Sequence, residues 1–281
     1  MIELDKRLHA YRPDLADARL RGRVQATQFS AGEIRVLAAP ITGLHREPRF
    51  DARQSTQALM GELMRVFDAR EGWAWVQLET DGYVGYISED MLTAPGKPAT
   101  HRVAVPSTFM FPGPDIKTQP VTVLPMNAAL AVVKEDEKFA NLANGRFVIR
   151  EHLKPRGNDE RDFIEVAERF LHVPYLWGGK SVVGLDCSGL VQLSLEAAGN
   201  PCPRDSDMQE KTLGQSLPIG GLNNLKRGDL IFWDGHVGIM TDNQNLLHAN
   251  GHFMQVTKEP LVQAAARIAA SYGELTAIKR L

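Results

Sequence analysis

The sequence predicts two small all-β barrels followed by an α+β domain, and three observations support this fold class. Short apolar runs separated by Gly, Pro and Asp-Gly pairs fill residues 22–95, and residues 99–154 show the same sequence pattern. Over residues 158–281, apolar residues at helical spacing alternate with strand-like runs. The length of 281 residues fits two or three modules, at roughly 100 to 200 residues per domain.

Residues 1–21 are predicted to form a short arm before the first barrel. Their leucines follow a loosely helical spacing, which Pro13 interrupts. The first barrel is expected to end near Pro95 and Pro98, because proline lacks the amide donor that a continuing strand ladder needs.

The two barrels share a sequence pattern that indicates duplication. Segment 81–92 has an Asp-Gly pair, a strand pattern and a closing leucine, and segment 144–153 has an Asn-Gly pair followed by the same features. The period of about 62 to 66 residues accommodates about five short strands per copy. We expect the second barrel to be structural, with no ligand of its own.

The last module is predicted to mix helices and strands. Helical spacing over residues 163–171 predicts a helix with Asp159 or Asn158 as its N-cap. A second helix is expected over residues 190–198, ending at Gly199. Strands are expected over residues 229–233, 236–240 and 245–249.

Composition excludes several classes of function. The 32 Lys and Arg residues against 34 Asp and Glu residues give a net charge of -2, which argues against nucleic acid or an anionic membrane as the partner. No apolar run approaches the ~20 residues of a membrane span. The first residues are charged and unlike a secretory signal, so we expect a cytoplasmic protein, with export by another route left open. Protein partners are not indicated.

Cys187 is the candidate nucleophile. It follows a Gly-rich loop and lies at the start of the second predicted helix, where the helix N-terminus and a nearby imidazole would lower the thiol pKa. His236 opens one predicted strand and His248 lies near the end of the next, so antiparallel pairing would bring the two imidazoles together. This arrangement predicts a Cys-His pair for acyl transfer, with the second histidine orienting the first.

Structural alternatives exist for each of these residues. With only two cysteines a disulfide framework is excluded, and Cys202, between two prolines, is expected to be a small buried hydrophobe. Cys187 could be the same. A structural zinc on Cys187, His236 and His248 is disfavoured because these residues contain no closely spaced ligand pair, so no metal or other cofactor is expected.

Five motifs in order carry a family resemblance: VPYLWGG at 173–179, DCSGLV at 186–191, GDLIFW at 228–233, GHVGI at 235–239 and LHA at 247–249. Residues 158–281 thereby resemble the NlpC/P60 family of papain-like cysteine peptidases. The two barrels resemble bacterial SH3 domains. The whole arrangement is similar to γ-D-glutamyl-L-diamino-acid endopeptidases, which act on murein peptides.

The resemblance implies roles for individual residues. Cys187 would be the nucleophile, His236 the general base, His248 the residue that orients it, and Tyr175 a partner of the oxyanion. The groove would be lined by Asp186, Ser188, Arg204 and Ser206. An arginine there can pair with the α-carboxylate of a γ-linked D-glutamate, and an aspartate can accept from an α-ammonium group. Outside this context, both would more often be surface or capping groups.

The first barrel contains two further candidates. In relatives that act on free peptides, an acidic residue and a tyrosine of the first SH3-like domain close the groove around a free N-terminal L-alanine. The resemblance assigns these roles to Glu62 and Tyr83. The alternative is a solvated carboxylate at a strand edge and a tyrosine that belongs to the barrel.

The sequence therefore predicts a cysteine peptidase that hydrolyses the amide between γ-D-glutamate and a diamino acid in murein peptides, in cell-wall turnover or recycling. Two alternatives remain at this point. The chain could be a non-catalytic peptidoglycan-binding module, or an N-acetylmuramoyl-L-alanine amidase or acyltransferase, because one fold supports several chemistries.

Overall fold

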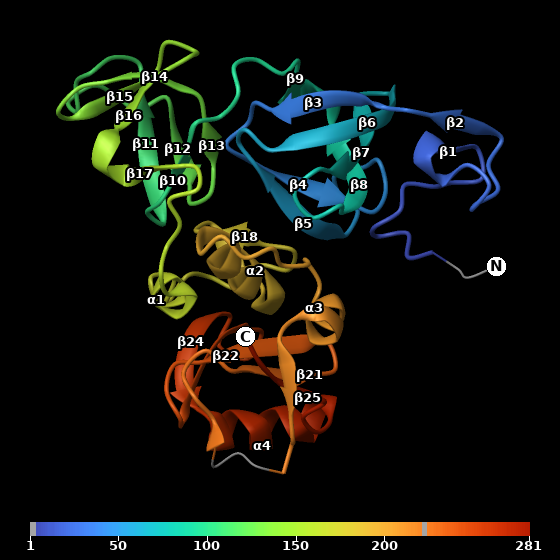
Figure 1. Cartoon of the computed structure of the whole chain (residues 1–281), viewed down its shortest axis with the longest axis vertical. Coiled ribbons are helices and arrows are strands. Elements are labelled where there is room, and N and C mark those ends of the chain that lie inside the picture. The colour runs from blue at the N-terminus through green and yellow to red at the C-terminus, as the bar shows by residue number, and fades with distance from the viewer. Residues whose placement is uncertain (1–3, 221–223) are drawn as a thin grey trace. The chain divides into compact units, whose positions relative to one another are not determined.

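A computed structural model describes residues 4–220 and 224–281 of the chain. The chain divides into two compact units, Met1–Arg156 and Gly157–Leu281. The division falls between the predicted end of the second barrel at residue 154 and the predicted start of the α+β module at residue 158. Both units are seen in Figure 1, and each is described by itself.

The N-terminal arm is a small parallel ribbon. It consists of β1 (Leu15–Asp17), the 3₁₀ turn η1 (Ala18–Leu20) and β2 (Gln28–Ser30). Because β1 pairs with β2, the arm extends to about residue 30, beyond the predicted end at residue 21. The Arg12 guanidinium lies 4.3 Å from the Trp75 ring and donates to Asp68 at 2.8 Å, which ties the arm to the first β module.

The first β module is one antiparallel seven-stranded sheet in the order β5-β4-β8-β7-β6-β3-β9 (Figure 1). Its elements are β3 (Glu33–Leu37), β4 (Ile41–His45), β5 (Gln54–Leu59), β6 (Leu63–Arg70), β7 (Trp73–Leu78), β8 (Val84–Ser88), η2 (Glu89–Met91) and β9 (Leu92–Thr93). Along β8, buried residues alternate with half-buried ones, as expected for a strand with one face on a core. Leu44, Met64, Val76 and Ile87 are fully buried in that core.

The second β module contains a five-stranded sheet, β12-β11-β16-β15-β14, and a three-stranded sheet, β13-β10-β17. Its elements are β10 (His101–Val103), β11 (Ser107–Phe111), β12 (Thr122–Pro125), β13 (Ala129–Leu130), β14 (Val132–Glu135), β15 (Phe139–Leu142), β16 (Phe147–Ile149), η3 (Arg150–His152) and β17 (Leu153–Pro155). With β13 and β14 together in the place of β6, the second module repeats the strand order of the first, and the break between β13 and β14 divides its strands into two sheets. The predicted duplication therefore extends to the strand order.

The two β modules meet at a turn of the first. The Ala129 amide donates to the Met60 carbonyl at 2.8 Å. Next to it, Gly61 has φ +82°, and a Cβ on this residue would lie 2.0 Å from the Ala129 carbonyl oxygen. Glycine is required here both for the left-handed backbone and for the close approach.

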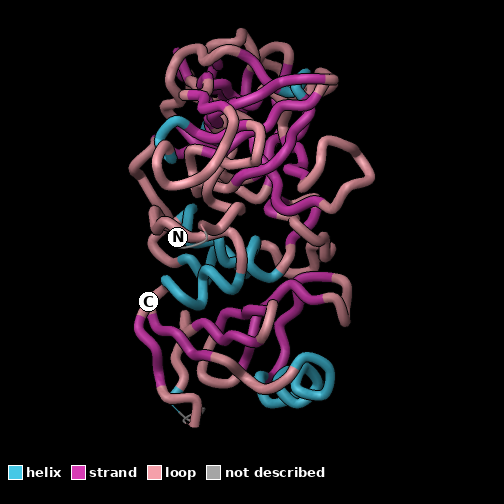
Figure 2. The backbone as a smooth tube through the Cα atoms, turned by 90° about the vertical axis from the view of Figure 1, so that its right-hand side faces the viewer, coloured by secondary structure: helices cyan, strands magenta, loops and turns pink. Residues whose placement is uncertain are grey.

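The second unit is built on an antiparallel six-stranded sheet in the order β20-β25-β21-β22-β23-β24. Its strands are β18 (Lys180–Ser181) and β19 (Gly184–Leu185), which form a separate pair, and β20 (Gln215–Leu217), β21 (Leu230–Trp233), β22 (His236–Met240), β23 (Asn245–Asn250), β24 (Gln255–Pro260) and β25 (Ala277–Arg280). The large sheet lies between α2 (Cys187–Ala197) on one face and α4 (Leu261–Tyr272) on the other, as Figures 1 and 2 show.

Helix boundaries differ from the predicted ones at their N-termini. The helix α1 (Phe163–Glu168) begins after Asp162, whose carboxylate accepts from the Ile164 amide at 2.8 Å, so Asp162 rather than Asp159 or Asn158 is the N-cap. Helix α2 begins at Cys187, three residues before the predicted start, and α3 (Ser206–Thr212) follows it. None of the helices in the two described ranges is both long and apolar enough to cross a bilayer.

Candidate active site

Cys187 lies where α2 begins and where a β-hairpin turns. It is the first residue of α2, after the N-cap Asp186, and its side chain is 7% exposed. The thiol lies 4.0 Å from the Gly235 carbonyl oxygen, and the Val237 amide donates to the sulfur from the other side of the same turn. The nucleophile therefore contacts the residues that flank His236.

The two predicted histidines contact each other. Strands β22 and β23 are antiparallel, with Ile239 opposite Leu247, so the register places His248 opposite Gly238 and two residues from His236. The His236 Nε2 lies 2.8 Å from the His248 Nδ1, and His248 is fully buried. The predicted meeting of the two imidazoles is confirmed.

A carboxylate lies behind the second histidine. The His248 Nε2 is 2.8 Å from Glu259 Oε1 on β24, and the Arg267 guanidinium on α4 donates to both oxygens of this carboxylate at 2.6 and 2.7 Å. The sequence analysis missed Glu259 and Arg267. The sequence marks them only weakly, as an acid at the end of a strand and an arginine eight positions further on. Their contact with His248 can be inferred only once the β23–β24 register is known.

The resting thiol is neutral, contrary to the prediction that its pKa is lowered. Burial raises the pKa of Cys187 to about 12, and the Asp186 carboxylate acts in the same direction. The amides of Val237 and Ser188 act the opposite way, as expected at a helix N-terminus, but they are outweighed. Burial also lowers the pKa of His236 to about 3, so the pair is a thiol beside a neutral imidazole.

Asp186 organises the floor of the site. Its carboxylate accepts from the amides of Gly189 at 2.7 Å and Gly178 at 2.8 Å, which caps α2 and holds the Gly-rich loop. Arg204 donates to both of its oxygens, at 2.9 and 2.7 Å, and to the Ser188 Oγ at 2.9 Å. The Arg204 side chain is almost completely buried.

These contacts give Arg204 and Asp186 structural partners. Each binds the other in a buried ion pair, and Asp186 also caps α2. Their predicted contacts with substrate stay predictions. Ser188 belongs to the same network, and Ser206, half-buried, is the first residue of α3.

Tyr175 lies beside the nucleophile, as its predicted role requires. An isolated bridge pairs Tyr175 with Leu185, two residues before Cys187. Burial raises the pKa of the Tyr175 hydroxyl, and the negative charge of Asp186 acts in the same direction. The phenol therefore remains a hydrogen-bond donor at any physiological pH.

Family models match the chain in two places. Residues 172–267 match the NlpC/P60 family, and residues 44–92 match the bacterial dipeptidyl-peptidase SH3 domain. A protein of Bacillus subtilis named γ-D-glutamyl-L-lysine dipeptidyl-peptidase is 31% identical over 222 residues, a match that covers 69% of this chain and 71% of the relative. The chain belongs to the NlpC/P60 family. The resemblance inferred from the sequence motifs is thus confirmed, and the protein is a cysteine peptidase with a bacterial SH3 domain.

Two further matches agree with this assignment. A relative of the same name from Bacillus cereus is 26% identical over 227 residues, covering 69% of this chain and 66% of the relative. The crystal structure of an NlpC/P60 family protein from Bacillus cereus superposes with a TM-score of 0.74, covering 88% of this chain and 99% of that one at 22% identity. At this identity, the superposition supports the fold alone.

Glu62 and Tyr83 have structural roles within the first β module of this NlpC/P60 protein. Tyr83 is 3% exposed and packs in the core cluster of the module. The Glu62 carboxylate accepts from the Leu59 amide at 2.7 Å and closes the turn that contains Gly61. That these two residues also close a groove around the substrate stays a prediction.

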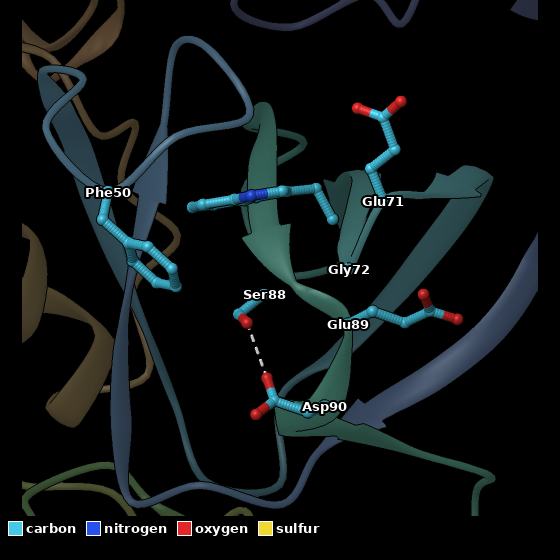
Figure 3. A pocket seen from close by; sticks show the side chains of 7 residues that line it. Phe50, Glu71, Gly72, Ser88, Glu89 and Asp90 are labelled. Atoms are coloured by element: carbon cyan, nitrogen blue, oxygen red, sulfur yellow. Dashed lines mark hydrogen bonds between the residues drawn. The ribbon is translucent and has the colours of Figure 1, made fainter.

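The first β module also has a surface pocket that contains none of the predicted site residues (Figure 3). Its lining consists of Phe50, Glu71, Gly72, Trp73, Ser88, Glu89 and Asp90. The Phe50 and Trp73 rings lie 4.8 Å apart, and the Ser88 Oγ donates to Asp90 at 2.6 Å. Across residues 4–220 and 224–281, no group of three or more His, Cys, Asp or Glu side chains is arranged to hold a metal ion.

Proposed function

We propose that this protein hydrolyses the amide bond between γ-D-glutamate and a diamino acid in peptidoglycan peptides. The observation that carries the proposal is the arrangement of Cys187 at the α2 N-terminus against the turn that bears His236, with His248 hydrogen-bonded behind it. The names of the two Bacillus relatives, γ-D-glutamyl-L-lysine dipeptidyl-peptidase, support the choice of bond.

The reaction begins from a neutral thiol and imidazole. The Cys187 sulfur adds to the γ-carbonyl carbon while its proton passes to His236, so that the thiolate exists only as the C–S bond forms. The carbonyl π electrons move to oxygen. The amide of Cys187, in the first turn of α2, and the Tyr175 hydroxyl supply donors to this oxyanion, each worth on the order of 3 kcal/mol of barrier.

Collapse of this intermediate breaks the amide bond. His236 returns the proton to the departing amine of the diamino acid, and a thioester remains on Cys187. Water then adds to the thioester with His236 as base, and the proton passes back to sulfur as the γ-carboxylate is released. The enzyme returns to its neutral thiol and imidazole.

We further propose that the preferred substrate begins with a free N-terminal L-alanine. A dipeptidyl-peptidase releases a dipeptide from an N-terminus, and the relatives carry this name.

The first test uses synthetic L-Ala-γ-D-Glu-L-Lys and its diaminopimelate counterpart, with products identified by mass spectrometry. Cys187→Ala should abolish release of L-Ala-γ-D-Glu. Cys202→Ala, at the other buried cysteine, should cleave within about twofold of the natural protein, because the Cys202 sulfur contacts the Pro203 carbonyl and the Gln209 amide, which have no part in the proposed chemistry. Cleavage by Cys187→Ala, or no cleavage of either peptide by the natural protein, would contradict the proposal.

The second test compares the tripeptide with its N-acetylated form. Blocking the amine should lower kcat/KM by on the order of 100-fold, because a buried site that binds an ammonium group rejects an analogue that lacks it. Equal rates for the two peptides would contradict the free-amine preference and leave the cleaved bond unaffected.

A further inference from the structure

Three side chains on three consecutive strands form a hydrogen-bonded line that ends in a carboxylate. His236 lies on β22, His248 on β23 and Glu259 on β24, and both links are 2.8 Å long. In the β23–β24 register His248 is opposite Thr257, two residues from Glu259, so each link joins diagonal neighbours on adjacent strands. Arg267 on α4 closes the line with two bonds to the carboxylate.

The carboxylate at the end of this line is ionised. Burial alone would raise the pKa of Glu259, but the hydrogen bonds from Arg267 and His248 outweigh it and lower the pKa to about 2. An ionised carboxylate only accepts hydrogen bonds. The 2.8 Å contact with Glu259 therefore requires that the His248 Nε2 carries a proton.

The proton on the His248 Nε2 also determines the tautomer of His236, the proposed catalytic base. With its proton on Nε2, neutral His248 has a bare Nδ1, which accepts from the His236 Nε2. Neutral His236 then has its proton on Nε2 and a bare Nδ1, the nitrogen that does not contact His248. That nitrogen is the one that can take the thiol proton.

Hydrogen-bond direction, rather than charge, is what the Glu259–Arg267 pair contributes. Burial is the main cause of the lowered pKa of His236; the Arg267 charge acts in the same direction and the Glu259 carboxylate in the opposite one, so the two members of the ion pair oppose each other at the base. Arg267 keeps the carboxylate ionised and fixes the orientation of both oxygens.

We propose that Glu259, oriented by Arg267, is a positioning residue that selects the ring tautomers of His248 and, through it, of His236. The inference rests on the proposed role of His236 as the base. In the absence of Glu259, His248 can donate from Nδ1 to His236, which would place the His236 proton on Nδ1 and leave no acceptor for the thiol.

The substitution Glu259→Gln tests this directly. The glutamine is close in shape but uncharged, and Arg267 donates to both positions of this group, so either orientation of the amide sets its NH2 against an Arg267 donor. The fixed, ionised acceptor that faces His248 is thereby lost. We expect kcat to fall on the order of 10- to 100-fold, with KM within about twofold, since orientation of the base and not substrate binding is altered.

Glu168→Gln is the matched control. Glu168 is also bound by an arginine, with Arg227 at 3.2 Å, but it lies on α1 and contacts neither histidine. It should retain kcat within about twofold. A kcat for Glu259→Gln equal to that of Glu168→Gln would overturn the proposal.

A second measurement is independent of activity and of how the variant folds. In the ¹⁵N spectrum of the natural protein, the imidazole nitrogens of His248 and His236, assigned with His248→Gln, should each show a protonated Nε2 and a bare Nδ1. A protonated Nδ1 on His236 would overturn the proposal even if Glu259→Gln does not fold. Loss of cleavage in Cys187→Ala with full activity in Glu259→Gln would reject this inference alone and leave the proposed function standing.

Discussion

At the scale of single residues, the nucleophile and its base are both held in their uncharged forms by burial. Cys187 has its pKa raised to about 12, and His236 has its pKa lowered to about 3. A helix N-terminus predicts an ionised cysteine, and the two amides at the sulfur do act that way. The loss of hydration at a 7% exposed side chain is the larger effect, and a sequence pattern does not report burial.

Alkylation rates should show this neutral state. In the Cys202→Ala background, reaction of Cys187 with iodoacetamide should be slow at pH 7 and should rise with pH up to at least pH 10, because only the thiolate reacts and the pKa of Cys187 is raised. A rate that is already at its plateau at pH 6 would show a thiolate–imidazolium pair instead. Free cysteine measured in parallel provides the reference.

The depressed pKa of His236 also makes stability depend on pH. An unfolded histidine binds a proton below about pH 6.5, whereas the folded one binds it only near pH 3. The unfolded state therefore gains protons as the pH falls from about 6.5 to 3, and the free energy of unfolding should decrease over this window.

Urea unfolding at pH 7, 5 and 4 measures this effect. His236→Gln should lose less stability between pH 7 and pH 4 than the natural protein. His252→Gln, at an exposed histidine, should keep the natural dependence. Identical slopes for His236→Gln and the natural protein would show that the His236 pKa is not depressed.

At the scale of elements, the N-terminus of α2 is held by one carboxylate that does several things. Asp186 caps the helix, binds the Gly178 amide and neutralises the buried Arg204.

Asp186→Ala should lower the free energy of unfolding by about 3 to 5 kcal/mol, because it leaves a buried guanidinium without its carboxylate. Asp162→Ala, which removes the N-cap of α1 next to a more exposed arginine, should cost about 1 kcal/mol. Chemical denaturation monitored by tryptophan fluorescence gives both values, and equal costs would contradict the account of Asp186.

The elements that the sequence analysis predicted well are those with a strong local pattern. The strands 230–233, 236–240 and 245–250 and the helix that starts at Cys187 carry alternation, turn residues and a helix stop. What it missed depends on partners distant in the chain. The parallel pairing of β1 with β2 extends the predicted arm to about residue 30, and the burial of Tyr83 and the contact of Glu259 with His248 exist only once strands are paired.

At the scale of the whole molecule, the chain keeps its chemistry and its SH3 homology in separate units. All contacts of Cys187, His236, His248 and Glu259 described above lie within Gly157–Leu281. The predicted dependence on Glu62 and Tyr83 is the part of the site that would cross this division, and both residues have partners inside their own module.

Gly61 gives a test at this scale, because it lies where the two β modules meet. Gly61→Ala would place a methyl group 2.0 Å from the Ala129 carbonyl oxygen, whereas Gly72→Ala has the same left-handed backbone and open space around it. Both substitutions introduce the backbone strain of a positive φ, but only Gly61→Ala should separate the two β modules. We expect it to lower the melting temperature of the first unit by about 5 °C more than Gly72→Ala does.

Calorimetry and limited proteolysis distinguish the units. Cleavage between the β modules should accelerate in Gly61→Ala and not in Gly72→Ala, while a protease-resistant fragment of Gly157–Leu281 persists in both. Equal behaviour of the two variants would show that the Met60–Ala129 contact does not hold the modules together.

The strand β24 is the last in its sheet, and on its outer side the backbone of residues 172–175 bonds to residues 254–256. Glu259 lies on the part of the strand past that support. Edge strands open locally more readily than central ones. The activity would then depend on how often this edge strand opens. Warming would abolish the activity while Cys187, α2 and the central strands of the sheet were still folded.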